Sequence, residues 1–229
     1  MTTARHFTPA TFKFLRDLAV NNDRDWFNAN KDRYEAKLRE PALDFVRDFE
    51  EPLHAISPHF RADDRKVGGS LFRIYRDVRF SKDKSPYKTY TGVQFRHAAA
   101  KDVHAPGFYL HLQPKSFFVG LGIWHPDSPT LGKIRRAIMD DPVGWHEAMA
   151  APAFANGFEL SGDSLKRNPQ GISPEHPQIE DLKRKDFIAV KPLTQKNVTS
   201  AGFVDEFAAL CDSGAPFVEF LCDAIGVPF

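Results

Sequence analysis

The chain has 229 residues, 42% of them hydrophobic and 27% charged, a length and composition that support a buried core and exclude global disorder. The 31 Lys and Arg residues nearly balance the 30 Asp and Glu residues, which excludes a strong overall attraction to nucleic acid or to an anionic membrane. No stretch approaches the roughly 18 consecutive apolar residues of a membrane-spanning helix, so no membrane partner is expected.

The cysteine content and the N-terminal segment predict a cytoplasmic location. The two cysteines, Cys211 and Cys222, are too few for the disulfide framework of a small secreted domain. The segment MTTARHFTPATFKFLRDL reaches charged residues before any long apolar run develops, unlike a signal peptide. No repeat, low-complexity tract or linker divides the chain, so one globular domain over residues 1–229 is predicted.

Helix-start signals predict three helices in the N-terminal region. Thr8 followed by Pro9 opens the first, because the Thr hydroxyl caps free amides and proline has no N–H to leave unpaired in the first turn. A second helical stretch carries Trp26 and Phe27, which are interpreted as core anchors, and Pro41 begins the third helix.

Beyond Ser57-Pro58 the pattern of apolar residues changes from helical to extended. One strand is expected from Ser70 to Tyr75, after a Gly-Gly pair, and another from Thr91 to His97. The stretch AAAKDVHAPG that follows is predicted to be a surface loop, because Pro and Gly punctuate it.

A β-hairpin is the strongest tertiary prediction. Two alternating runs flank Pro114-Lys115 in GFYLHLQPKSFFVGLGIW, and pairing Gln113 with Ser116 sets the register. One face of the hairpin is then wholly apolar and belongs to the core. Its opposed pairs are Phe108 with Leu121, Leu110 with Val119, and Leu112 with Phe117.

The other face of the hairpin has a different character. Tyr109 lies opposite Gly120 and His111 opposite Phe118, with Gly122 and Trp124 further along. This polar and aromatic surface, locally without side chains, has the features of a ligand-admitting face. A bulge or a closely packed helix is the other explanation for glycines in a strand.

The remaining elements complete an α+β fold. Helices are predicted from Ser128 and from Asp141-Pro142, in the segment IEDLKRK, near Ala201 to Cys211 and near Pro216 to Ala224, and short strands at Phe158 to Ser161 and Phe187 to Val190. Helices, then mostly adjacent strands, then helices predict a mainly antiparallel sheet packed with N- and C-terminal helices.

Basic residues are concentrated in RIYRDVRFSKDKSPYKT, which runs from Arg73 to Thr89 and holds six basic residues against two aspartates. Guanidinium groups hold phosphate or carboxylate in bidentate geometry, and lysine adds a mobile charge, so the segment predicts an anion site. The expected function is binding of a phosphorylated or carboxylated small molecule, or noncovalent acid–base action on it. The candidate binding residues are Arg73, Arg76, Arg79, Lys84, Tyr87 and Lys88 of this segment, with Tyr109 and His111 of the hairpin.

Two alternatives use the same cations. The first is a nucleic-acid-binding module in which Tyr87 or Tyr90 stacks on a base, although the near-zero net charge argues against it. The second is a salt-bridge network, or ordinary solvated loop charges, with no ligand at all. Convergence of the cations on an open concave site favours a ligand, whereas a carboxylate facing each guanidinium favours a structural network.

Motifs for metals, cofactors and covalent catalysis are missing from the sequence. His111, His125 and Asp127 have metal-ligating groups, but their spacing matches no known metal motif, so neither a metal nor a cofactor is predicted. There is no phosphate-binding or dinucleotide fingerprint and no G-x-S-x-G elbow. Catalytic residues, the reaction and the oligomeric state stay unassigned.

Four segments carry a resemblance to a known family: NNDRDWFNANKDRY, RIYRDVRFSKDKSPYKT, GLGIWHP, and LKRNPQG followed by HPQIEDLKRKDF. The chain resembles, over nearly its whole length, the conserved hypothetical proteins of bacteria and fungi designated domain of unknown function 2461. The resemblance implies a single globular domain and no established activity, cofactor or catalytic residue. Because the central segment is the family's most recognisable stretch, the resemblance favours an anion site there over solvated loop charges.

Overall fold

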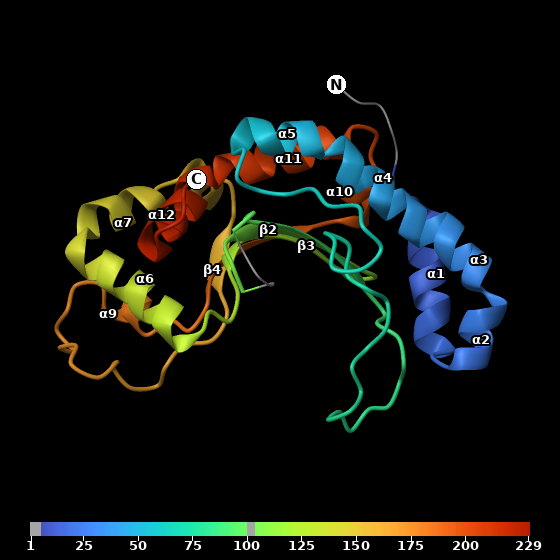
Figure 1. Cartoon of the computed structure of the whole chain (residues 1–229), viewed down its shortest axis with the longest axis horizontal. Coiled ribbons are helices and arrows are strands. Elements are labelled where there is room, and N and C mark those ends of the chain that lie inside the picture. The colour runs from blue at the N-terminus through green and yellow to red at the C-terminus, as the bar shows by residue number, and fades with distance from the viewer. Residues whose placement is uncertain (1–5, 100–103) are drawn as a thin grey trace.

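A five-stranded antiparallel sheet of order β1-β2-β3-β5-β4 lies at the centre of residues 6–99 and 104–229, the part of the chain that this computed structural model describes (Figure 1). The strands are β1 (Thr91–Arg96), β2 (Gly107–Gln113), β3 (Ser116–Ile123), β4 (Glu159–Ser161) and β5 (Phe187–Leu193). The α+β class is therefore confirmed. Residues 100–103 of the predicted surface loop lie outside the described residues.

The helices precede, interrupt and follow these strands. Before the sheet come α1 (Pro9–Val20), α2 (Arg24–Ala29), α3 (Lys31–Tyr34), a π-helical turn η1 (Glu35–Arg39), α4 (Glu40–Asp48) and α5 (Glu50–Ile56). Between strands lie α6 (Ser128–Asp140), α7 (Pro142–Met149), α8 (Pro152–Ala155) and α9 (Ile179–Leu182), and after them α10 (Gln195–Val198), α11 (Phe203–Ser213) and α12 (Ala215–Ile225). Among the described residues, no helix has the length and apolar character needed to cross a lipid bilayer.

Local capping explains where several helices begin. At the start of α1 the Thr8 backbone N–H donates to Thr11 Oγ1 at 3.1 Å, and Pro9 occupies the first turn. At the start of α6 the Asp127 side chain accepts from the Thr130 N–H at 2.8 Å. These caps satisfy backbone donors that the helix itself leaves unpaired.

The predicted hairpin register is confirmed. Gln113 pairs with Ser116, and all three apolar pairs of the predicted core face are opposed in β2 and β3. Phe108, Leu110 and Leu112 are fully buried, whereas Tyr109 and His111 are partly exposed on the opposite face. The alternation of side chains along a strand thus sends the two sets to opposite faces, as expected.

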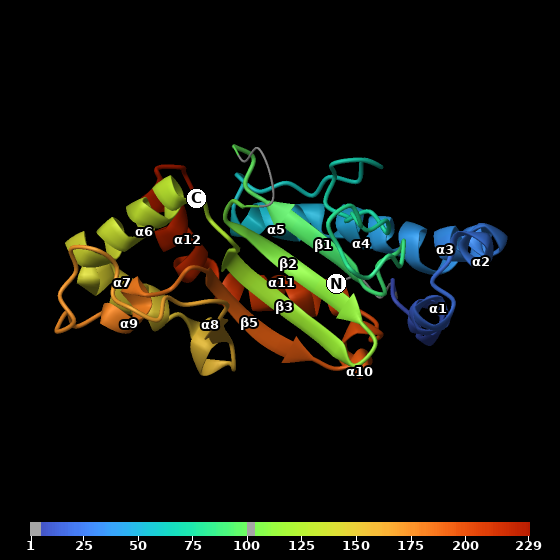
Figure 2. The same cartoon turned by 90° about the horizontal axis from the view of Figure 1, so that it is seen from below.

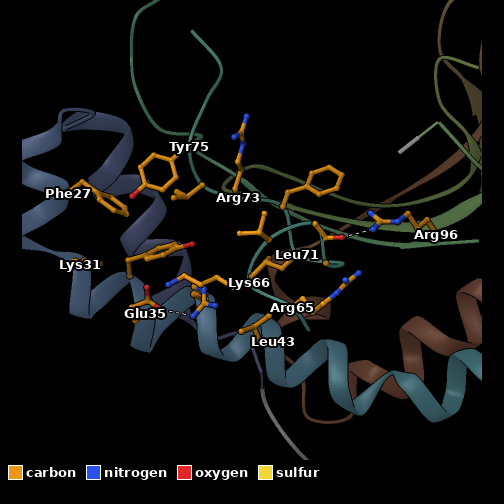
Figure 3. Close-up of a pocket in the computed structure, with 17 residues that line it drawn as sticks. Phe27, Lys31, Glu35, Leu43, Arg65, Lys66, Leu71, Arg73, Tyr75 and Arg96 are labelled. Carbon is orange, nitrogen blue, oxygen red and sulfur yellow. Dashed lines mark hydrogen bonds and ion pairs between the residues drawn. The ribbon is translucent and has the colours of Figure 1, made fainter. Parts of the chain in front are cut away.

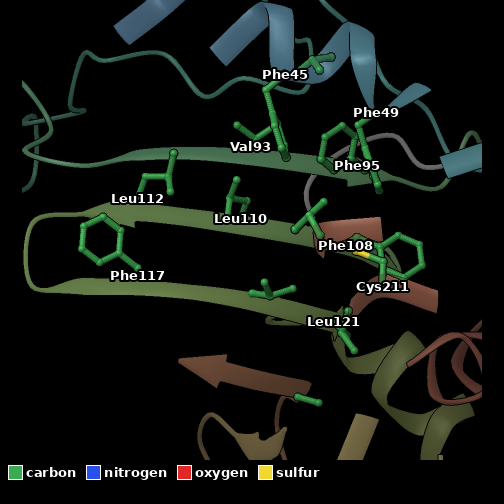
Figure 4. Packing of buried hydrophobic residues seen from close by; sticks show 14 of the residues in the cluster. Phe45, Phe49, Val93, Phe95, Phe108, Leu110, Leu112, Phe117, Leu121 and Cys211 are labelled. Atoms are coloured by element: carbon green, nitrogen blue, oxygen red, sulfur yellow. The ribbon is translucent and has the colours of Figure 1, made fainter. Parts of the chain in front are cut away.

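Aromatic packing joins the covered face of the sheet to the helices. The ring of Phe49, the residue between α4 and α5, lies 4.6 Å from that of Phe95 on β1 and 4.8 Å from that of Phe207 on α11, measured between centroids. Phe45 of α4 stands over the same strands (Figure 4). Burial of these rings contributes much of the hydrophobic stabilisation, since each large aromatic removes 150–250 Å2 from water as a rough guide.

On the opposite face of the sheet, the described residues form no helical layer. Figure 2 shows β1, β2, β3 and β5 from this side, with α5 and α11 behind them. This face is concave. The helices α6 and α9 lie at one end of it, and the basic segment from Arg73 to Thr89 extends below the sheet at the other (Figure 1). The helices therefore bury one face of the sheet and leave its concave face accessible.

The prediction of a continuous strand from Ser70 to Tyr75 is wrong. Leu71 forms an isolated bridge with Val93 of β1, but Tyr75 pairs instead with Tyr87 of the returning loop. The segment changes partner between these two points, so no uninterrupted ladder of hydrogen bonds forms. Tertiary contacts determine this change of pairing partner, and the apolar pattern of the segment carries no information about it.

Candidate functional site: a pocket on the uncovered sheet face

A cavity of about 470 Å3 lies on the uncovered face and is called the open-face pocket. It is lined mainly by rings and by uncharged polar groups. Its lining residues are Phe72, Tyr90, Gln94, Gly107, Tyr109, His111, Phe118, Gly120, Leu121, Gly122, Trp124, Ser161, Ile188 and Val190. The volume falls within the range of small-molecule sites.

Glycines, which have no side chain, shape the floor of this pocket. The Tyr109 side chain lies across Gly92, where an added Cβ would overlap the Tyr109 ring and hydroxyl. Next to Gly120 an added Cβ would make only ordinary contact with Tyr109, at 3.6 Å, so this glycine leaves room. Gly122 is different, because its backbone is packed tightly against Phe187 and the Phe217 ring of α12. Gly120 thus leaves space in the floor of the pocket, whereas Gly122 permits close packing of β3 against β5 and α12.

A chain of hydrogen bonds crosses the pocket floor. Tyr109 Oη lies 3.0 Å from His111 Nδ1, and His111 Nε2 lies 3.2 Å from Gln113 Oε1. Because the Gln113 carboxamide oxygen accepts, Nε2 carries the imidazole proton and Nδ1 accepts from the Tyr109 hydroxyl. The His111 ring also stacks on Phe118 with a centroid distance of 4.6 Å. These contacts hold His111 in one tautomer and one orientation.

Burial keeps these two groups uncharged near neutral pH. Desolvation lowers the pKa of His111, and the hydrogen bond to Gln113 opposes this only in part. Desolvation, followed by the effect of Tyr90, raises the pKa of Tyr109. The pocket floor thus provides hydrogen-bonding groups without a formal charge.

The lowered pKa of His111 predicts a loss of stability in mild acid. Below the ordinary His pKa of 6.5, His111 is protonated in the unfolded chain but stays neutral in the folded protein. The free energy of unfolding therefore decreases as the pH is lowered. Urea unfolding between about pH 7.5 and pH 5 should show this decline, and His111→Gln should make it shallower. The exposed His54 of α5 gives the control, since His54→Gln should retain the wild-type slope. Equal slopes in all three proteins would contradict the prediction.

Lys88 lies against two rings of the open-face pocket and itself lines a neighbouring groove that also holds Asp77 and Asp83. Its Nζ lies 5.4 Å from the centroid of Phe72 and 5.8 Å from that of Tyr90, and both rings line the pocket. Within the described part of the chain it has no ion pair. Desolvation and then the charge of Arg73 lower the pKa of Lys88. A partly buried ammonium group, with no ion pair among the described residues, therefore lies beside two rings of the pocket.

Tyr87 positions Lys88 from within the core. Its ring is 3% exposed and stacks on Phe27 with a centroid distance of 4.0 Å. The Asn22 side chain accepts from the Tyr87 N–H at 3.0 Å and donates to the Tyr87 carbonyl at 2.9 Å. Tyr87 thus anchors the returning loop and presents no ring at the surface.

Three other predicted cations are satisfied by their own loop. Arg76 Nη1 lies 2.5 Å from Asp83 Oδ2. Arg79 makes two bonds to Asp77, at 3.0 and 2.7 Å, which lower the pKa of Asp77 to about 2. Lys84 Nζ donates to the Val78 carbonyl at 3.0 Å. At these positions the charges are paired within the loop.

The predicted binding residues therefore separate into groups. Tyr109 and His111 line the open-face pocket. Lys88 lies against two of its rings but lines a neighbouring groove with Arg76, and Arg73 lines a third cavity beyond Phe72. Sequence reasoning missed Phe72 and Gln94 as pocket residues. The alternation of β1 carried the signal for Gln94, since it pairs with Tyr109 on the same face.

The residues considered for a metal have other partners. His125 Nδ1 lies 2.9 Å from the buried carboxylate of Asp186, and Asp127 caps α6. His111 bonds to Tyr109 and Gln113. Across residues 6–99 and 104–229, no three His, Cys, Asp or Glu side chains gather as a metal site.

Comparison with known proteins identifies a family but no named relative. A family model described as conserved hypothetical protein (DUF2461) matches residues 10–220, which include all five strands and every residue of the open-face pocket. No curated protein and no solved structure matches the chain. The match extends over most of the 229 residues, so the chain belongs to the conserved hypothetical protein family DUF2461.

Proposed function

We propose that the open-face pocket binds a small molecule in which a planar ring is joined to a carboxylate or phosphate group. The observation that carries the proposal is Lys88, an ammonium group without an ion pair beside a pocket lined by rings. The anionic group of such a ligand pairs with the Lys88 ammonium group, and its ring fills the aromatic cavity.

The ring component follows from the walls of the pocket. Phe72, Tyr90, Phe118 and Trp124 present aromatic surface, and the half-exposed Trp124 lies toward one end of β3. Aromatic rings favour stacked and edge-to-face contacts with a planar ligand. Tyr109 and His111 supply directional hydrogen bonds between these surfaces.

The anionic component follows from the position of Lys88. Taking an ammonium group out of water disfavours its charged form, as the lowered pKa of Lys88 indicates. An anion next to Nζ restores that form and makes a charge-assisted hydrogen bond. Acid–base action on the ligand is a further part of the proposal, because the Tyr109 hydroxyl is a proton donor and His111 Nδ1 a proton acceptor, and the two are hydrogen-bonded.

The nucleic-acid alternative receives less support. Tyr87, one of its two candidate stacking residues, is buried against Phe27. Arg76 and Arg79, two of its phosphate-binding candidates, already face Asp83 and Asp77. A backbone-binding surface needs several unpaired cations in a row, and this loop does not present them.

Thermal unfolding with a panel of aromatic carboxylates and phosphorylated ring metabolites tests the proposal, because a ligand that prefers the folded state raises its stability. At least one compound should raise the melting temperature. Lys88→Met should weaken its binding about tenfold or more, the usual effect of losing a hydrogen bond to a charged group. The control Lys82→Met removes an exposed lysine of the same loop and should bind normally. Turnover of each binder is assayed alongside.

Two results would overturn the proposal. One is a panel in which no compound shifts the melting temperature. The other is a binder whose affinity is the same for the wild type and for Lys88→Met. Binding confined to single-stranded oligonucleotides, with a steep loss as salt rises, would instead establish the nucleic-acid alternative.

A further inference from the structure

A second cavity, of about 540 Å3, lies on the other side of Phe72 (Figure 3). It is enclosed by the α2–η1 region and by residues 65–75, and is called the cationic pocket. Six basic side chains line it: Lys31, Arg39, Arg65, Lys66, Arg73 and Arg96. Among the described residues that line it, Glu35 is the single carboxylate.

Three of these cations have partners at the walls. Arg39 bonds to Glu35 at 2.9 Å and to Glu40 at 2.8 Å. The Arg65 guanidinium makes several bonds to one carboxylate, that of Asp63. Arg96 donates to the Gly68 carbonyl, so it has a hydrogen-bond acceptor but no carboxylate in contact. These contacts hold three guanidinium groups in fixed places.

Among the described residues, the other three cations have no bonded partner. In the part of the chain that the structure describes, Lys31, Lys66 and Arg73 take part in no ion pair and no side-chain hydrogen bond. They come from α3 and from both ends of the 65–75 segment, yet all line one cavity. Like charges brought to one cavity raise the local positive potential and attract anions.

Aromatic and apolar groups complete the cationic pocket. Phe27 and Tyr75 lie together at the end that also holds Lys31, and Leu43 and Leu71 lie toward the middle (Figure 3). The Tyr75 side chain is 52% exposed, so much of its ring is open to a ligand. Arg96 lies at the far end from this ring. The cavity thus joins an aromatic end to several positive charges.

We propose that the cationic pocket is a second binding site, for a ring compound that carries two or more phosphate groups, the chemistry of a nucleoside diphosphate. The ring contacts Tyr75, and the phosphates pair with Lys66, Arg73 and Lys31. Guanidinium and ammonium groups on several sides match the several oxygens of a polyphosphate. The cationic pocket is a separate cavity, because it shares one lining residue, Phe72, with the open-face pocket.

Isothermal titration with ADP, inorganic pyrophosphate and adenosine as probes separates the two components of the site. ADP should bind tightest, pyrophosphate more weakly, and adenosine least of all. The double variant Lys66→Gln with Arg73→Gln should bind ADP at least about tenfold more weakly, since two charge-assisted contacts are removed. Both side chains are exposed, so the urea midpoint should stay near that of the wild type.

A matched control removes the same charge elsewhere. Arg136→Gln with Lys166→Gln replaces one exposed arginine and one exposed lysine outside the cationic pocket, and ADP affinity should be unchanged. Equal ADP affinity in the Lys66 and Arg73 double variant and the wild type would overturn the site. So would absence of ADP binding, adenosine binding as tightly as ADP, pyrophosphate binding as tightly as ADP, or binding of single-stranded oligonucleotides alone.

Discussion

Gly122→Ala should lower the free energy of unfolding by roughly 3 to 5 kcal/mol, or prevent folding, because backbone strain and overpacking act together. Gly122 has φ of +107°, a conformation that L side chains rarely adopt. An added Cβ would also overlap the Phe187 carbonyl oxygen and press on the Phe217 ring. Either β5 must separate from β3 or α12 must shift, and both movements disrupt buried contacts.

Gly120→Ala provides the matched control two residues earlier on the same strand. Its Cβ would meet Tyr109 at 3.6 Å, an ordinary contact, and its φ is not positive. The free energy of unfolding from urea titration should change by no more than about 0.5 kcal/mol. Equal losses in the two variants would show that strand glycines are destabilised by substitution in general, and would refute the special role of Gly122.

Asp186→Ala should lower the free energy of unfolding by about 2 to 4 kcal/mol, because it leaves partly buried donors without acceptors. The side chain of Asp186 is 1% exposed. It accepts from the His125 backbone N–H at 2.7 Å, from the Asp163 N–H at 2.8 Å, and lies 2.9 Å from His125 Nδ1. The carboxylate therefore ties the end of β3 to the segment after β4.

Asp163→Ala and Asp186→Asn test this assignment in urea titrations. The Asp163 side chain is exposed and only its backbone N–H reaches Asp186, so its replacement should leave stability near that of the wild type. Asp186→Asn keeps the shape and one acceptor oxygen, and should lose less stability than the Ala variant. If Asp186→Ala unfolds at the wild-type midpoint, the carboxylate does not hold these segments together.

The sequence predicts some elements of this fold well for a local reason. In the hairpin, residues 107–123 alternate with period two around one tight turn, so the apolar face and the register follow from neighbouring residues alone. The segment from Ser70 to Tyr75 has a similar composition, yet its two ends pair with different partners. Which partner a segment finds depends on the whole fold, so this strand could not be predicted correctly.

The candidate site shows the same division between local and distant information. The pairing of Arg79 with Asp77 spans two residues and is readable from the sequence, but it removes Arg79 from the group of unpaired cations. The open-face pocket needs Ile188 and Val190 of β5 beside β3, and the cationic pocket needs Lys31 near Arg73. Proximity across such separations is created by folding, and composition cannot report it.

Phe72 is the wall that the two pockets have in common, and Lys88 lies over the same ring. A ligand that tilts this ring on one side changes the surface offered to a ligand on the other side. Thermodynamic linkage makes such an effect reciprocal: whatever factor the first ligand applies to the affinity of the second, the second applies to the first. Under the two proposals made above, Phe72 would therefore couple the binding of one small molecule to that of the other.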